Sequence, residues 1–185
     1  MTIARIIRAA DCPEVPWKNG GGTTREIAVC PPGAGLGDFL WRLSMARVEQ
    51  AGPFSSFDGI DRTLAVLEGT LHLSGAVDAV LDPVSAPFPF DGAASVEGVP
   101  LGGPVLDLNA MVRRGAYTCE MQRLPPGAMV TPAGTTFLLA LEAQTLDDTD
   151  LGYLDCAQID GPVTATGYAI LVSFSSLAPS ASTPP

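Results

Sequence analysis

Glycine and proline divide this chain into short segments. The 185 residues include 20 glycines and 17 prolines, and short apolar runs lie between them. No segment longer than about three turns keeps apolar residues at the i, i+3, i+4 spacing of an amphipathic helix. Short apolar runs bounded by turn-forming residues are typical of strands, so this spacing predicts an all-β fold.

Alternation along the apolar runs predicts which side chains share a face. In residues 39–45 every odd-numbered residue is apolar, whereas Arg42 and Ser44 are polar and lie on the opposite face of the expected strand. By the same rule Asp107 and Asn109 share one face. A short helical turn is possible around residues 52–60, and the proline-rich tail, 178–185, should be mobile. Strands are expected near residues 3–8, 24–30, 39–48, 62–68, 70–74, 104–112, 115–123, 135–142 and 168–174.

The charge and hydropathy of the chain exclude two classes of partner. The net charge is −10 and no basic cluster occurs, so we expect no nucleic-acid partner, since phosphate contacts need a positive surface. No apolar run approaches the ~20 residues of a membrane span, so we expect no membrane partner. The arginines near the N-terminus are not followed by an apolar stretch, which argues against a signal peptide and favours a cytoplasmic location.

Cysteine and histidine usage argues against metal and redox chemistry. Cys12, Cys30, Cys119 and Cys156 are widely separated, with no CxxC pair, so free thiols are expected. The single histidine, His72, cannot supply the two or three His of a catalytic zinc or non-haem iron site. It alternates with apolar residues, which indicates an ordinary strand residue on a polar face. We therefore expect no metal, no cofactor and no identified catalytic residue.

Three consecutive glycines, Gly20–Gly22, follow Trp17 and precede an expected strand. The only lysine, Lys18, lies before the glycines instead of after them, and no helix follows, so neither a Walker A loop nor a Rossmann loop fits. The run is predicted to form the rim of a binding site, with Trp17 as a wall or lid and with Asn19, Thr23 and Thr24 as possible polar contacts. A small anion-binding nest and a turn packed beneath Trp17 are the other two interpretations.

Two arginines are candidates for binding an anion. Arg42 lies mid-strand and needs a partner if it is buried: a ligand carboxylate, or Asp61, Asp107 or Glu26. Arg62 opens an apolar strand, either at the rim of a ligand site or as a surface charge beside Asp61. Asp107 and Asn109 can orient a ligand, anchor Arg42, or form a polar pair that joins two strands.

Residues Val66–Leu71 resemble the VLEG strand and turn of the cupin β-barrel family. In metal-binding cupins the pattern G-x5-H-x-H-x3-4-E precedes that turn. Here residues 52–62 fill this stretch, with no histidine among Ser55–Asp58 and with Arg62 at or near the glutamate position. A cation at that place repels a metal and attracts an anion.

A wider set of motifs consists of Trp17, Asn19–Gly22, Thr24, Glu26–Ile27, Trp41–Arg42, Ser44, Gly52–Ser55, Phe57, Arg62, Asp107–Asn109, Met111 and Arg113. Together these motifs resemble the HutD/Ves family over about residues 13–143. The resemblance implies a metal-free bicupin, with two fused jelly-roll-like cupin barrels in a single unit of residues 1–177. The first barrel takes about residues 1–100, including the N-terminal strands, and the second about 101–177. A faint repeat between residues 64–69 and 138–143 agrees with two units.

The resemblance also implies a role beside the histidine-utilization pathway. HutD-like members are thought to be accessory or regulatory proteins that sense a small carboxylate of the urocanate or N-formylglutamate type. The alternatives are a metal-free enzyme, isomerase-like or epimerase-like, working through Asp107 or His72, and an interaction protein. Because cupins often form dimers, the resemblance also implies a possible homodimer. Ligand contacts are expected from Trp17, Asn19, Thr23, Arg42, Ser44, Arg62, Asp107 and Asn109.

Overall fold

The computed structural model describes residues 2–177, and the tail that we expect to be mobile lies outside them. Within the described residues the only helix is a three-residue 3-10 helix, η1 (Ala9–Asp11), and every strand pairing is antiparallel. No helix among the described residues is long and apolar enough to cross a membrane. The all-β prediction is confirmed.

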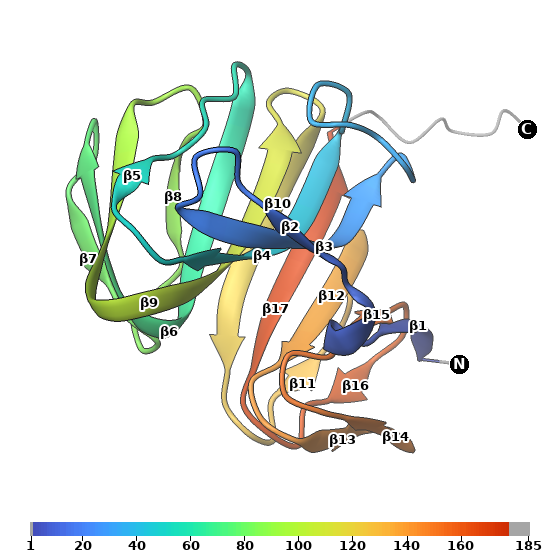
Figure 1. The fold of residues 1–185 in the computed structure, drawn as a ribbon. Helices are drawn as coiled ribbons and strands as arrows, with labels where there is room; N and C mark the ends of the chain where they lie inside the picture. Colours follow the sequence, from blue (N-terminus) through green and yellow to red (C-terminus); the bar gives the residue numbers. More distant parts are fainter. Residues whose placement is uncertain (1, 178–185) are drawn as a thin grey trace, which may run out of the picture.

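The first large sheet has eight strands, which lie between residues 14 and 113 of the chain (Figure 1). Six of them follow the order β2-β3-β4-β9-β6-β7, while β5 pairs with β9 and β8 pairs with β6. The strands are β2 (Glu14–Pro16), β3 (Gly22–Cys30), β4 (Trp41–Val48), β5 (Gly52–Pro53), β6 (Ile60–Gly75), β7 (Ala79–Leu81), β8 (Phe88–Asp91) and β9 (Val96–Arg113).

The second large sheet has the order β1-β15-β12-β17-β10. Its strands are β1 (Ile3–Ile7), β10 (Tyr117–Leu124), β12 (Thr135–Ala140), β15 (Cys156–Ile159) and β17 (Ala169–Ser176). Two small sheets pair β11 (Met129–Val130) with β16 (Val163–Thr164) and β13 (Gln144–Leu146) with β14 (Thr149–Leu151). Neither large sheet returns to its first strand, so no closed barrel is found among the described residues.

The N-terminal strand joins the C-terminal part of the chain. β1 pairs with β15, and Figure 1 shows it in blue beside the orange strands. The boundary expected near residue 100 lies inside β9. The division of the chain into two barrel units at that residue stays a prediction.

Two sequence-based expectations about local structure are wrong. The strands expected at 62–68 and 70–74 are one strand, β6, which continues through Gly69 at φ +80° with register shifts on either side of Glu68. A glycine at a bulge lets a long strand bend without ending. The helical turn expected at 52–60 is absent from the described chain, because Gly52 and Pro53 form β5 and pair with β9.

The apolar face of β4 joins the two large sheets. Trp41 stacks on Phe174 of β17, with ring centroids 4.5 Å apart, and meets Phe137 of β12 edge-on at 5.6 Å. Leu43 and Met45 are buried in the same cluster, as the alternation predicted. Phe39 precedes the first residue of β4 and packs instead against Ile60 and Met111.

The glycine run forms the turn between β2 and β3. The Trp17 N–H donates to the Gly22 carbonyl at 2.9 Å, and Gly20 has φ +72°. The N–H groups of Gly20 and Gly21 donate within the turn, to the Trp17 carbonyl and to Asn19 Oδ1. Because both N–H groups already donate to protein acceptors, they are not available to bind an anion in a nest. A turn packed against Trp17 is what the structure has.

Gly22 is the residue of this turn least able to accept a side chain. A Cβ there would collide with the Arg47 carbonyl oxygen and lie 3.1 Å from the Trp17 ring. Gly22→Ala should therefore lower the free energy of unfolding by about 1–3 kcal/mol, measured by chemical denaturation. The control is Gly37→Ala, where an added Cβ meets nothing within 4 Å and the change should stay within about 0.5 kcal/mol. Equal stability of the two variants would contradict this account of the turn.

Candidate functional site

A cavity of about 840 Å³ lies over the polar face of the first sheet. Its floor comes from β4, β6 and β9, and its walls come from the β2–β3 turn, residues 34–36 and residues 53–57. A second hollow of about 370 Å³ lies near β11 and β16 and contains none of the residues singled out from the sequence. The cavity is lined by Trp17, Asn19, Arg42, Ser44, Arg62, Asp107 and Asn109, seven of the eight expected ligand contacts.

Strand register explains why these residues meet. Residues opposite each other in paired strands project to the same side of a sheet. The residues of β9 that face the cavity lie between β4 and β6, so both neighbours add side chains to the same face. The β4–β9 pairs are Arg42 with Met111, Ser44 with Asn109, and Ala46 with Asp107, and the β6–β9 register sets Arg62 beside Met111 as well.

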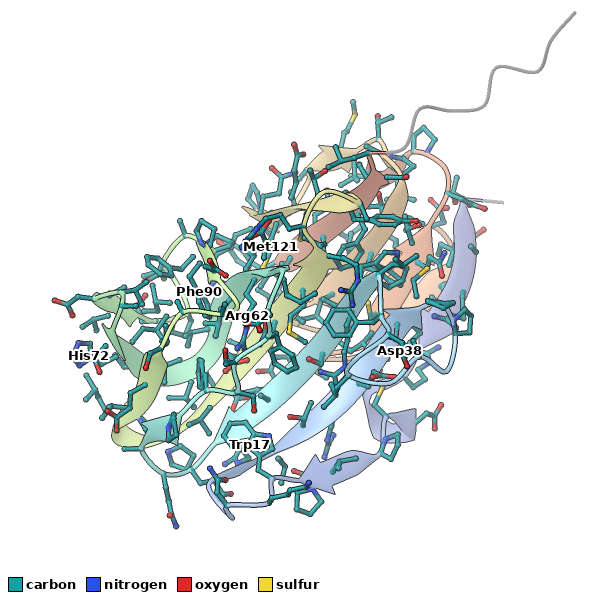
Figure 2. The ribbon with its side chains drawn as sticks, turned by 90° about the horizontal axis from the view of Figure 1, so that it is seen from above. Trp17, Asp38, Arg62, His72, Phe90 and Met121 are labelled. Carbon is teal, nitrogen blue, oxygen red and sulfur yellow. The ribbon has the colours of Figure 1, made fainter. Side chains whose placement is uncertain are left out.

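Arg62 is a buried cation with incomplete hydrogen bonding. It is 6% exposed, and its guanidinium carbon lies 5.1–5.8 Å from the ring centroids of Phe54, Phe57 and Phe90. One terminal nitrogen donates to the Ser55 carbonyl at 3.2 Å, but the buried Nε has no partner. Burial lowers the pKa of Arg62 to about 10, so the side chain stays charged at neutral pH. Figure 2 shows Arg62 close to Phe90, inside the molecule.

The surface alternative for Arg62 is not what the structure shows. Asp61, its expected partner at the surface, pairs with Arg114 instead, at 2.6 Å. Neighbouring residues of a strand point to opposite faces, which separates Asp61 from Arg62. Arg62 therefore points to the cavity and Asp61 points away from it.

Asp107 and Asn109 are buried acceptors on the central strand. They are 1% and 7% exposed, and the Oδ1 atom of each is buried without a hydrogen-bond partner. Burial raises the pKa of Asp107 to about 7, and the nearby positive charge of Arg62 opposes this shift. Asp107 and Arg62 nevertheless make no ion pair in the described chain. Among the described residues, Asp107 therefore neither anchors Arg42 nor forms a polar pair that joins two strands.

Arg42 pairs with Glu26, one of the three carboxylates considered as its partner from the sequence. Its Nε donates to Glu26 Oε2 at 2.8 Å, and a terminal nitrogen lies 3.4 Å from Ser44 Oγ. The side chain of Arg42 is 14% exposed and that of Glu26 is 42% exposed. Arg42 is thus partly neutralised near the mouth of the cavity, whereas Arg62 lies deeper and has no carboxylate partner.

Thr23 is the one expected contact that lies outside the cavity. Its hydroxyl donates to Glu14 Oε1 at 2.5 Å on the exposed side of the β2–β3 hairpin. Thr24 lies on the opposite face, lines the cavity, and accepts a hydrogen bond of 2.7 Å from Trp17 Nε1. Since successive strand residues alternate, only one of the two threonines can face inward.

Several lining residues were not identified from the sequence. Phe54 and Phe57 belong to a segment without a strand period, so no pattern indicated that their rings surround Arg62. Glu26, by contrast, was one of the partners considered for Arg42, and Thr24, a possible polar contact of the glycine run, shares its face of β3 and lines the cavity with it.

The lone histidine lies away from this cavity. His72 Nε2 is 2.8 Å from Asp78 Oδ1, and Figure 2 shows His72 at the outer edge of the first sheet. Among residues 2–177 no three His, Cys, Asp or Glu side chains cluster closely enough to hold a metal ion. The cavity itself, with two arginines on its wall, offers a poor set of ligands for a cation.

Comparison with known proteins places this architecture in one family. The HutD family model matches residues 9–170. A 21.2 kDa Pseudomonas putida protein in the hutC 3′ region is 34% identical over 171 residues, covering 87% of this chain and 89% of that protein. Protein Ves of Citrobacter koseri is 39% identical over 101 residues, about half of each chain.

A solved structure agrees with the sequence comparison over nearly the whole chain. The structure of HutD from Pseudomonas fluorescens SBW25 superposes with a TM-score of 0.82 at 32% identity, covering 93% of this chain and 98% of that one. Protein Ylba from Escherichia coli shares the fold alone, with a TM-score of 0.70 at 9% identity. The chain belongs to the HutD family.

Proposed function

We propose that this HutD-family chain is a small-molecule-binding protein that takes a small carboxylate in the cavity beside Arg62 and Arg42. The observation that carries the proposal is the buried Nε of Arg62, which has no partner in the described chain. A buried donor left without an acceptor is costly, and a guanidinium group suits bidentate carboxylate recognition. The volume of about 840 Å³ falls in the range of small-molecule sites.

The proposed biological role is an accessory or regulatory one in histidine utilization. The Pseudomonas putida relative lies in the hutC 3′ region, which supports this context. Ligands of the urocanate or N-formylglutamate type each carry a carboxylate that the two arginines can hold. A sensing role needs binding but no turnover, and it assigns no catalytic task to any residue.

The two-unit description of the fold belongs to the same proposal. The faint internal repeat supports it, because residues 64–69 lie in β6 of the first large sheet and residues 138–140 lie in β12 of the second. We propose that each large sheet descends from one cupin unit and that the ligand occupies the first.

An enzymatic role is the second candidate, and Asp107 is the observation that favours it. A buried carboxyl with a pKa of about 7 beside a cation suits a general base for removing a proton next to a carboxylate. His72, the other residue considered for catalysis, does not line the cavity.

The binding proposal predicts a thermal shift that depends on the cavity arginines. Urocanate or N-formylglutamate at about 100 times its Kd should raise Tm by about 5 °C or more, because a ligand that binds only the native state stabilises it. Arg62→Met, which keeps the length of the side chain between the phenylalanine rings, should abolish the shift. Arg42→Gln should reduce it.

Arg47→Ala is the matched control, because Arg47 is 44% exposed and lies outside the cavity. Its thermal shift should equal that of the unmodified protein. A full shift in Arg62→Met would show that the arginine is structural and would overturn the proposal.

The pKa of Asp107 predicts how carboxylate binding depends on pH. A bound anion near Asp107 favours the neutral carboxyl, so binding is coupled to proton uptake. Affinity for butyrate, which stays ionised in this range, should be nearly constant below about pH 6 and fall several-fold between about pH 6 and 8.5 as Asp107 ionises. Titration calorimetry measures the profile, and Asp107→Asn should flatten it. A flat profile in the unmodified protein would contradict this account.

The enzymatic alternative predicts exchange of a ligand proton. If Asp107 acts as a base, a bound acid incubated in D2O should lose the NMR signal of the proton next to its carboxylate, and Asp107→Asn should stop the loss. The binding proposal predicts no exchange beyond that in buffer. Protein-dependent exchange that disappears in Asp107→Asn would favour the enzyme.

A further inference from the structure

At one end of the cavity, called here the acceptor end, Asp107 and Asn109 present hydrogen-bond acceptors that lack donors. Asp107 and Asn109 lie on the same face of β9 and each has a buried Oδ1 atom with no donor in the described chain. A carboxylate bound to the arginines does not satisfy these atoms, since it brings only acceptors. Two neighbouring buried acceptors require hydrogen-bond donors.

Distance along β9 separates this acceptor end from the arginines. Arg42 and Arg62 are both level with Met111, Asn109 lies two residues further along, and Asp107 lies two residues beyond that. At about 3.3 Å per residue, the backbone positions of Met111 and Asp107 are about 13 Å apart. The long arginine side chains shorten the gap, but no hydrogen bond or ion pair closes it in the described chain.

The groups around the gap leave room for a ligand. Ser44 and Ala46, the β4 neighbours of Asn109 and Asp107, are small. The other charged side chains on the cavity wall are Glu26, which is paired with Arg42, and Lys18 on the β2–β3 turn. The row along β9 therefore runs from a cationic end at the arginines to an acceptor end at Asp107.

We propose that the ligand is bipolar, with its carboxylate held at Arg62 and Arg42 and an N–H donor held by the Oδ1 atoms of Asp107 and Asn109. The inference rests on the proposed function and adds the second pole of the same site. Asp107 and Asn109 select acids that carry an amide, azole or amine N–H over simple fatty acids and keto acids. An ionised Asp107 makes the stronger, charge-assisted bond of the two.

Matched pairs of acids that differ only in the N–H test this selection. N-Acetylglycine, N-acetyl-β-alanine and N-acetyl-4-aminobutanoate pair with 4-oxopentanoate, 5-oxohexanoate and 6-oxoheptanoate, in which CH2 replaces the N–H. The three lengths vary the separation between the N–H and the carboxylate. At one length or more, titration calorimetry at pH 8 should show the N-acetyl acid binding about tenfold more tightly than its keto acid.

Variants of Asp107 test whether this side chain causes the preference for the N-acetyl acids. Asp107→Leu removes both acceptor oxygens and has nearly the same shape, so the ratio of the two affinities should fall to about one. If circular dichroism shows that this variant does not fold, Asp107→Asn, which keeps a neutral acceptor, should lower the ratio several-fold. Asp78→Asn is the control: Asp78 is exposed, pairs with His72 outside the cavity, and should leave the ratio unchanged.

The outcomes separate this inference from the proposed function. Equal binding of both members at all three lengths would overturn the bipolar ligand while the carboxylate site stands. A preference that survives Asp107→Leu would overturn the role of Asp107. Binding of neither set would overturn the carboxylate site and the inference together.

Discussion

The two faces of β4 are the constraint on which the rest of this structure depends. Trp41, Leu43 and Met45 are buried against the second sheet, with the Trp41 ring stacked on Phe174. A strand has only two faces, so once this one is committed to the apolar core, Arg42 and Ser44 must lie on the other. The register of β9 with its two neighbours, β4 and β6, then brings Asp107, Asn109 and Arg62 to that same face.

That arrangement gathers more buried polar groups than the chain satisfies. Arg62 keeps favourable contacts with three phenylalanine rings, which suit a cation, yet its Nε has no acceptor. Each such group destabilises the ligand-free fold, and removing it would be expected to stabilise the protein. Stability and recognition therefore oppose each other at this wall, which is a common property of binding sites.

The sequence predicted the parts of the fold and site that depend on short-range periodicity. Turn residues and alternation gave the all-β class, the buried face of Trp41 to Met45, and the shared face of Asp107 and Asn109. It did not predict pairing between distant segments, such as β1 with β15, or the position of Phe54 and Phe57 around Arg62. The β1–β15 pairing joins residues far apart in the sequence, and Phe54 and Phe57 lie on irregular backbone. Neither feature leaves a periodic pattern in the sequence. Thr23 and Thr24 were both considered as polar contacts, and only Thr24 lines the cavity, because the phase of β3 decides which of two adjacent residues faces it.

The two arginines differ in a way that decides the charge of the inner cavity. Glu26 pairs with Arg42 near the mouth, where both side chains reach solvent, so this pair adds little net charge to the interior. Arg62 stays positive because its pKa is about 10, and Asp107 alone balances it. With Asp107 protonated, the inner cavity holds one positive charge and favours an anion. With Asp107 ionised, it is neutral but polarised along β9, and a ligand with both an acid and an N–H matches it better than an acid alone.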